Sequence, residues 1–127
     1  MEAGGGPEDQ SARAGNVEEL LLGMSALSLE HPLVFLGDTN LHPQDPVDGP
    51  LSMRFEEELG LEDVCKTLNC EEPNRIDRIY FRSGKAVELV ALEWRVAPEF
   101  VDAEGAVLSD HDAIAARFRW AKSAPID

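Results

Sequence analysis

The stretch that sets the fold class is Leu33-Val34-Phe35-Leu36-Gly37-Asp38-Thr39-Asn40 (residues 33–40). Its first four residues form an unbroken apolar run between Pro32 and Gly37, which predicts a β-strand buried on both faces. Asp38 and Asn40 follow where this strand is expected to end. A carboxylate and an amide at the rim of a sheet can orient a water molecule and bind a phosphate oxygen. Taken alone, residues 37–40 are better explained as a turn, because Gly, Asp and Asn are favoured turn residues.

Upstream of this strand, the sequence predicts a tail and one helix. Residues 1–15 have no hydrophobic periodicity and are expected to form a flexible tail. Asn16 is a good N-cap with an acid, Glu19, three residues later, so the helix is expected to begin there. The apolar residues that follow have helical spacing, and the helix is expected to end at His31-Pro32.

Downstream, the pattern predicts an α/β fold with the element order α-β-α-β-β-β. The last strand alternates, with Ile114, Ala116, Phe118 and Trp120 on one face, so it is expected to be half-buried and antiparallel to a neighbour. The expected segments are a loop at 40–50, a helix at 53–59 capped by Ser52 and closed by Gly60, a further turn at 61–68, strands at 75–82, 86–96 and 112–120, an acidic loop at 98–107, and a tail at 121–127.

Composition narrows the classes of function. The 127 residues carry 25 acids against 11 bases, a formal charge of −14, which excludes a generic nucleic-acid coat protein. One stretch is locally basic, residues 75–85, with four cations and one acid, and is either a phosphate-binding surface or a solvated strand face. No apolar run approaches the ~20 residues of a membrane span, and the start lacks a signal-peptide pattern, so an intracellular protein is expected. Cys65 and Cys70 could pair, but two reduced thiols are the preferred interpretation.

Two further short motifs contain residues suited to phosphate chemistry. Asp77 lies inside an apolar strand in the run Arg75-Ile76-Asp77-Arg78-Ile79, where an unpaired carboxylate would be costly to bury. Without a known partner for Asp77, a solvated or salt-bridged carboxylate explains its place in the strand as well as a functional role does. Ser109-Asp110-His111 precedes the last strand, and the ordinary histidine pKa of ~6.5 suits a general acid or base. Alone, this second motif is better explained as a turn with a surface histidine.

The order of the three motifs is more specific than any one of them. A buried strand with GDTN, a strand with RID, and SDH before a final alternating strand resemble the C-terminal half of the endonuclease/exonuclease/phosphatase (DNase I-like) superfamily. The resemblance covers about residues 16–120, which are therefore expected to form the C-terminal portion of such a domain. GDTN with Asp77-Arg78-Ile79 is most similar to 5′-tyrosyl-DNA phosphodiesterases. Asn40-Leu41-His42-Pro43 and Leu108-Ser109-Asp110-His111 are more similar to neutral sphingomyelinases.

The resemblance implies a role for each site residue. Asp38 would orient or deprotonate the attacking water, and Asn40 would bind the scissile phosphate. His111 would contact a phosphate oxygen and stabilise the charge of the transition state. Asp77 would hydrogen-bond His111 and favour its cationic form, which gives Asp77 the partner it otherwise lacks. Asp110 would lie at a Mg²⁺ (or Mn²⁺) site, because such hard cations take oxygen ligands.

The resemblance also implies that part of the domain is missing. The superfamily domain is a four-layer sandwich of two β-sheets with helices outside, and its N-terminal half carries the principal metal-binding Glu. Nothing in residues 1–32 matches that half. We therefore expect a half domain that is completed by a missing N-terminal half or a second chain. The expected function is a metal-dependent phosphodiester hydrolase acting on DNA ends such as 5′-phosphotyrosyl DNA. The alternatives are a phospholipid phosphodiesterase of the sphingomyelinase kind and a non-catalytic interaction remnant.

Overall fold

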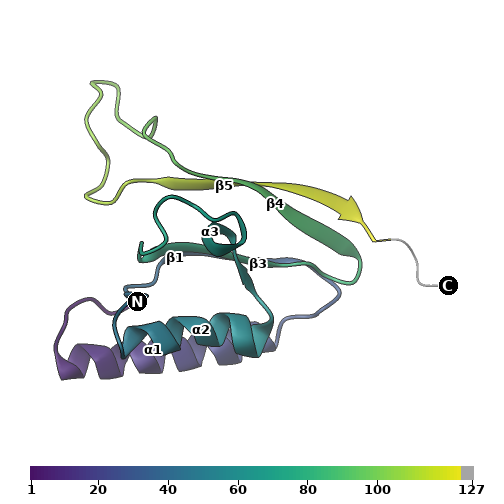
Figure 1. The fold of residues 1–127 in the computed structure, drawn as a ribbon, viewed down its shortest axis with the longest axis horizontal. Helices are drawn as coiled ribbons and strands as arrows, with labels where there is room; N and C mark the ends of the chain where they lie inside the picture. Colours follow the sequence, from purple (N-terminus) through teal and green to yellow (C-terminus); the bar gives the residue numbers. More distant parts are fainter. Residues whose placement is uncertain (124–127) are drawn as a thin grey trace.

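The computed structural model describes residues 1–123 and arranges them in stacked layers (Figure 1). Two helices cover one face of a first sheet, and a second sheet packs on its other face. The expected α/β class with antiparallel sheets is confirmed, and a short helix not predicted from the sequence is added. In chain order the elements are α1 (Pro7–Ser25), β1 (Leu33–Asp38), α2 (Asp48–Leu59), β2 (Glu62–Asp63), α3 (Val64–Thr67), β3 (Asp77–Arg82), β4 (Val87–Val96) and β5 (Ile114–Lys122).

The sheets are small and antiparallel. The first has the strand order β1-β3-β2, and the second consists of β4 and β5. In the first sheet Asp38 is the cross-strand partner of Asp77, so the end of β1 lies beside the start of β3. The order of the sheet therefore brings together two of the predicted site residues, which lie far apart in the sequence.

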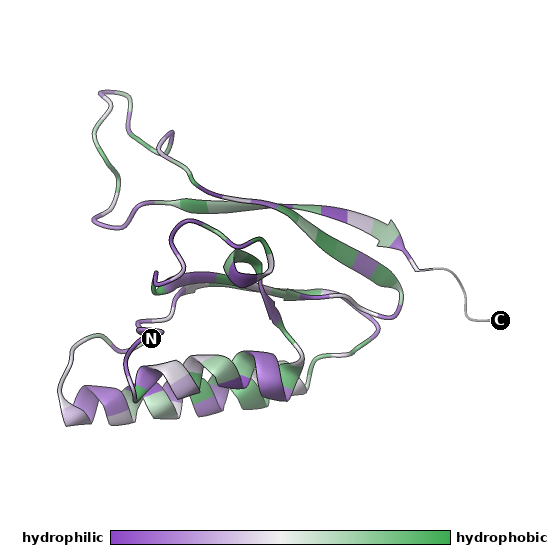
Figure 2. Cartoon of the chain, viewed as in Figure 1, coloured by the Kyte–Doolittle hydropathy of each residue, from purple (hydrophilic) through white to green (hydrophobic). Residues whose placement is uncertain are grey.

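Two hydrophobic clusters hold the layers together. Between the helices and the first sheet, Phe35, Phe55 and Tyr80 pack with ring centroids 5.2–5.9 Å apart. Between the two sheets, Phe81 of β3 meets Phe118 of β5 at a centroid distance of 5.2 Å. Figure 2 shows apolar residues along the helix faces and strands that meet at these layers.

The prediction of a flexible tail over residues 1–15 is wrong from Pro7 onward, because α1 begins there. Asp9 accepts a hydrogen bond from the backbone nitrogen of Gly6 at 2.9 Å, which satisfies one donor at the helix start. Arg13 is buried and pairs with buried Asp48 at the start of α2. This anchor is 35 positions away in sequence, so local periodicity could not reveal it. The expected N-cap, Asn16, lies inside the helix instead.

The prediction that residues 33–36 are buried on both faces is also wrong. Leu33 and Phe35 are half-buried beneath the helices, whereas Val34 and Leu36 are exposed. Their cross-strand partners Phe81 and Ile79 are buried under the second sheet. The second sheet therefore covers β3 but leaves the same face of β1 open.

Smaller differences concern element ends. Helix α2 begins at Asp48 rather than after Ser52, whose hydroxyl instead donates to the carbonyl of Gly49. The expected helix end at Gly60 is confirmed, with Gly60 in the left-handed region at φ 63°. Residues 61–68 form β2 and α3 rather than a continuing turn. The last strand runs to Lys122 and is antiparallel to β4 as expected, but Trp120 is exposed. Of the tail predicted at 121–127, residues 124–127 lie outside the described residues.

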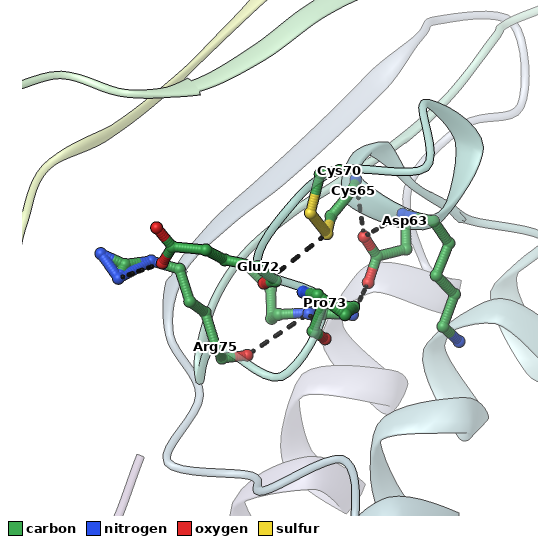
Figure 3. Close-up of a disulfide and its surroundings, with 8 residues drawn as sticks. Asp63, Cys65, Cys70, Glu72, Pro73 and Arg75 are labelled. Carbon is green, nitrogen blue, oxygen red and sulfur yellow. Dashed lines mark hydrogen bonds and ion pairs between the residues drawn. A yellow bond between two sulfur atoms is a disulfide. The ribbon is translucent and has the colours of Figure 1, made fainter.

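The two cysteines form a disulfide, which corrects the expectation of reduced thiols (Figure 3). Cys65 and Cys70 lie at the two ends of a tight turn in which the backbone nitrogen of Cys70 donates to the carbonyl of Cys65 at 2.9 Å. This turn brings their Cα atoms to 4.9 Å, within the normal range for a bridge. Asp63, next to the bridge, caps α3 and pairs with buried Arg78.

Candidate phosphodiesterase site

The candidate site lies at the rim of the first sheet, where β1 ends and β3 begins. Asp38 and Asp77 are directly opposite each other in the antiparallel register, so their side chains share one face of the sheet. His111 comes from the loop between β4 and β5 and reaches this rim from the second sheet. The three side chains therefore come from both sheets.

His111 contacts both carboxylates, but not equally. Its Nδ1 lies 3.0 and 3.1 Å from the two carboxylate oxygens of Asp77. Because a carboxylate only accepts, Nδ1 carries the proton and donates it to Asp77. Nε2 lies 3.9 Å from Oδ2 of Asp38, beyond a hydrogen bond. The ring is thus held by Asp77 and presents its other nitrogen toward Asp38.

The same contacts set the charge of the histidine. The hydrogen bond to Asp77 and the negative charge of Asp77 raise the pKa of His111, and the charges of Asp38 and Asp110 add to this effect. A raised pKa favours the imidazolium near neutral pH. When His111 is protonated, the rim offers an Nε2–H donor beside the acceptor carboxylate of Asp38.

Asn40 and Thr39 are placed by a tight turn after β1. Asn40 adopts a left-handed φ of 49°, which Asn tolerates, and its backbone nitrogen donates to Oδ1 of Asp38 at 2.8 Å. The Asn40 side-chain amide donates to the carbonyl of Met1 at 2.8 Å, so it does not contact His111 or Asp77. Thr39 was not singled out by the sequence, yet it is buried and its hydroxyl donates to the carbonyl of Ile76 at 2.8 Å. Thr39 thereby ties the GDTN turn to the segment before Asp77.

Asp110 is exposed and does not join the close cluster. Its nearest polar partner is the hydroxyl of Ser109 at 3.5 Å. One ligand atom from each of Asp38, Asp77 and His111 lies within 4.8 Å of the others, but Asp77 is already engaged by His111. Asp110 is therefore not part of the group of possible metal ligands that Asp38, Asp77 and His111 form.

In the basic stretch at residues 75–85, Arg78 and Arg82 form neither a phosphate-binding surface nor a solvated face, whereas Lys85 is exposed. Arg78 and Arg82 are buried, Arg78 against Asp63 and Arg82 against the carbonyls of Leu59 and Leu27. The other two cations are also paired: Arg75 with Glu72 and Asp112, and Lys85 with Glu30. The arginines therefore hold elements together.

A cavity of about 260 Å³ opens beside the cluster. It is walled by the end of β1, the start of β3 and the segment from Ser109 to Ile114, and both Asp77 and His111 line it. The Arg75–Asp112 pair, at 3.1 Å, links the loop before β3 to the segment that carries His111. The site is therefore a recess at the junction of the two sheets.

The described residues thus form two stacked antiparallel sheets with helices on one outer face and a His–Asp pair at the rim. A crystal structure of humanized D. rerio TDP2 with 14 mutations matches with a TM-score of 0.61 and 21% sequence identity. The match covers 93% of this chain and 49% of that one, so the chain spans about half the length of its neighbour and shares its fold over that half. No family model matches the sequence, and no curated protein does.

Among residues 1–123, none of the helices has the length and apolar character needed to cross a membrane.

Proposed function

We propose that this chain is the His–Asp half of a metal-dependent phosphodiesterase that hydrolyses DNA ends bearing a 5′-phosphotyrosyl group. The observation that carries the proposal is the contact of Asp77 with His111 beside Asp38, at a rim reached by both sheets. The fold shared with TDP2 and the resemblance of GDTN and Asp77-Arg78-Ile79 to 5′-tyrosyl-DNA phosphodiesterases support this substrate class.

In this proposal each residue acts on one part of the reaction. Asp38 orients the attacking water and accepts its proton as the water oxygen bonds to phosphorus. His111, held through Nδ1 by Asp77, donates from Nε2 to a non-bridging phosphate oxygen as negative charge develops. The bond between phosphorus and the tyrosyl oxygen breaks, and the phenolate takes a proton from solvent. Asn40 binds the phosphate once its amide leaves the carbonyl of Met1.

We further propose that catalysis requires a second half. Mg²⁺ or Mn²⁺ would take one oxygen from Asp110 and the remaining protein oxygens from a segment or chain that this half does not contain. Mg²⁺ dehydrates reluctantly and is poorly held by one or two carboxylates. We therefore expect weak Mg²⁺ binding and little turnover by the chain alone. Isothermal titration that shows tight Mg²⁺ binding, together with rapid hydrolysis of a phosphodiester reporter, would contradict this expectation.

The test of function uses the chain alone and co-expressed with its neighbouring reading frames. Tyrosine release from a 5′-phosphotyrosyl oligonucleotide supports the proposal, whereas phosphocholine release from sphingomyelin would support the phospholipid alternative. If every such combination folds stably and hydrolyses neither substrate, the chain is a non-catalytic interaction module. A nuclear or cytoplasmic location fits the first outcome.

Variants of an active preparation test the roles. Asp38→Asn should lower kcat by ~10²–10⁴-fold, the usual cost of losing a general base. His111→Ala should lower kcat more than it raises KM, because its contact strengthens in the transition state. The double variant Asp77→Asn/His111→Ala should be little worse than His111→Ala, since the pair acts as a unit. His31→Ala, an exposed histidine outside the site, is the control. Fully additive losses would show that Asp77 and His111 act independently.

A further inference from the structure

The segment that precedes α1 lies against the candidate site, and we call residues 1–5 the strap. The nitrogen of Met1 donates to the carbonyl of Asp38 at 3.3 Å, and the carbonyl of Met1 accepts from the side-chain amide of Asn40 at 2.8 Å. The Met1 side chain is half-buried and packs on the hydrophobic cluster between the helices and the first sheet. In Figure 1 the start of the chain accordingly lies between α1 and the first sheet. The strap is therefore in direct contact with the turn that follows β1.

Two asparagine side chains hold a single peptide group of the strap. Nδ2 of Asn40 donates to the carbonyl of Met1, and Oδ1 of Asn16 accepts from the backbone nitrogen of Glu2 at 3.1 Å. The Met1 carbonyl and the Glu2 nitrogen belong to one peptide bond, so its acceptor and its donor are both paired. An Asn side chain has a donor end and an acceptor end, and each asparagine here uses the end that matches. We call these two side chains the clamp.

Asn16 contributes to the clamp and not to the helix that carries it. It was expected to cap the helix but lies inside α1, where an Asn is less favourable than an Ala. The reason is that a short polar side chain competes for the backbone hydrogen bonds of the helix. Asn16 is half-buried, and its side-chain oxygen reaches out of the helix to Glu2. The contact with the strap therefore accounts for an Asn at this position.

The path of the strap from α1 back to the clamp depends on Gly4. Gly4 has a φ of 100°, which residues with a side chain rarely adopt. A Cβ at this position would lie 2.4 Å from Oδ2 of Asp9, and that oxygen already accepts from the backbone nitrogen of Gly6 at 2.9 Å. Nη1 of buried Arg13 donates to the Gly4 carbonyl at 2.6 Å. The strap is therefore anchored by Arg13 at one end and by the clamp at the other.

The clamp shares one residue with the proposed phosphodiesterase site. Asn40 binds the phosphate in the proposed function, but its amide here faces Met1 and does not contact His111 or Asp77. A phosphate that uses this amide must therefore displace the carbonyl of Met1.

We propose that the clamp is a binding site for a main-chain peptide group, and that the strap occupies it as an autoinhibitory contact that withholds the Asn40 amide from phosphate. Strap and phosphate then compete, so phosphate binds only the fraction of molecules in which the strap has left Asn40. The competition rests on the proposed function, whereas the clamp rests only on the contacts of the strap.

Two substitutions in the full chain should release the strap while Asn40 stays in place. Gly4→Ala puts a Cβ against Asp9 in a backbone conformation that Ala rarely adopts. Asn16→Ala removes the acceptor for Glu2 and favours the helix, so loss of the contact is not confused with unfolding.

Each release variant has a matched control. Gly5→Ala adds a Cβ that meets no atom within 4 Å, one residue away from Gly4. Ser11→Ala removes an exposed polar side chain from the same helix as Asn16. Both controls should keep the strap in the clamp and should behave as the wild type in both measurements.

The first measurement is NMR of the Asn40 side-chain amide and the Glu2 backbone amide, and it needs no ligand. In the wild type the Asn40 amide protons should be protected from exchange with water, and Glu2 should be as rigid as α1. Both release variants should lose this protection and this rigidity. A flexible Glu2 in the wild type, or an unchanged Glu2 in both release variants, would overturn the clamp.

The second measurement is the affinity for dimethyl phosphate, followed through the ring signals of His111. Release of the strap should tighten binding roughly fivefold, because the hydrogen bonds that hold it each contribute little net free energy in water. Variants that release the strap without tightening binding would overturn the competition for Asn40. If none of these proteins binds dimethyl phosphate, the proposed phosphate site fails, and the clamp is supported or overturned by the Glu2 and Asn40 signals alone.

Discussion

The hydrogen bond between Asp77 and His111 accounts for the position of both side chains. A carboxylate in an apolar strand needs a cation or donors, and His111 provides the donor through Nδ1. In return Asp77 fixes which nitrogen of the ring carries the proton and which is presented toward Asp38. In the proposed function the charge state of this one histidine decides whether the rim attracts phosphate, so it is the first quantity to measure.

We predict that His111 titrates above the ordinary histidine value of ~6.5. The hydrogen bond and charge of Asp77 raise its pKa, so Asp77→Asn should move the midpoint back toward that value. Asp112→Asn, a nearby carboxylate that pairs with Arg75 rather than with the ring, is the control and should have a much smaller effect. The measurement is the pH dependence of the His111 ring-proton shifts in NMR. An unchanged midpoint in Asp77→Asn would contradict the assigned pairing.

The same shift makes folding stability depend on pH with a defined sign. Because the pKa of His111 is raised on folding, the protonated histidine stabilises the folded state. Its contribution is fully present below the unfolded value of ~6.5 and is lost as the pH rises through the folded value. Urea unfolding of the wild type and Asp77→Asn on both sides of this window should show the difference shrinking as the pH rises. A difference that grows with pH would contradict the prediction.

The order of the three motifs predicted the candidate site, whereas no single residue was enough to predict it. The sequence placed Asp38, Asp77 and His111 together because three separate motifs agreed with one resemblance. It could not show that Asn40 donates to Met1, because that contact spans 39 positions. The arginines of residues 75–85 were misjudged for the same reason, since their acidic or carbonyl partners lie on other elements.

At the level of elements, the Arg13–Asp48 pair joins α1 to α2. Both side chains are almost fully buried, with Nε of Arg13 at 3.1 Å from Oδ1 of Asp48. Arg13→Ala leaves a buried carboxylate without its partner and should lower the free energy of unfolding by about 3–5 kcal/mol. The control is Arg54→Ala, whose partners Glu18 and Glu58 are solvent-accessible, with an expected loss of about 0–1 kcal/mol. Urea unfolding followed by circular dichroism measures both, and equal losses would show that burial of the pair is unimportant.

The disulfide gives a second prediction at this level. Cys65–Cys70 closes a short loop beside α3 and the Asp63–Arg78 pair. Closing a loop of this length stabilises a fold by about 2 kcal/mol in the chain-entropy model. Cys70→Ser should therefore unfold at lower denaturant concentration than the oxidised wild type and should match the wild type in reductant. Insensitivity of the wild type to reductant would show that the bridge contributes nothing to stability.

Elements were predictable where local chemistry decides them. Gly60 ends α2 because the left-handed position favours glycine, and Ile114, Ala116 and Phe118 of β5 pack against the core as their alternation predicts, although Trp120 is exposed. The start of α1 was missed because its stabilising contact comes from Asp48. The exposure of Val34 and Leu36 was missed because an apolar run predicts burial but does not indicate whether a second sheet covers each face of the strand.

For the whole molecule, the open side of the sandwich is the main feature. Among residues 1–123, β1 pairs only with β3, so its other edge has no strand partner, and the second sheet does not cover Val34 (42% exposed) or Leu36 (63% exposed). A chain that spans about half of its structural neighbour would present such a surface where the rest of a domain packs. An unpaired edge beside exposed apolar side chains also promotes association between copies.

We therefore predict that the chain alone associates through this side as its concentration rises. Leu36→Lys adds a charge to the exposed face of an edge strand, where it should disfavour pairing between copies while changing folding stability by no more than ~0.5 kcal/mol. Sedimentation velocity over a range of concentrations should show the wild type shifting to larger species and Leu36→Lys remaining monomeric. Leu108→Lys places the same charge on the loop between β4 and β5, at similar exposure, and should associate as the wild type does. If Leu108→Lys rather than Leu36→Lys abolishes association, copies of the chain associate through the loop between β4 and β5 and not through β1.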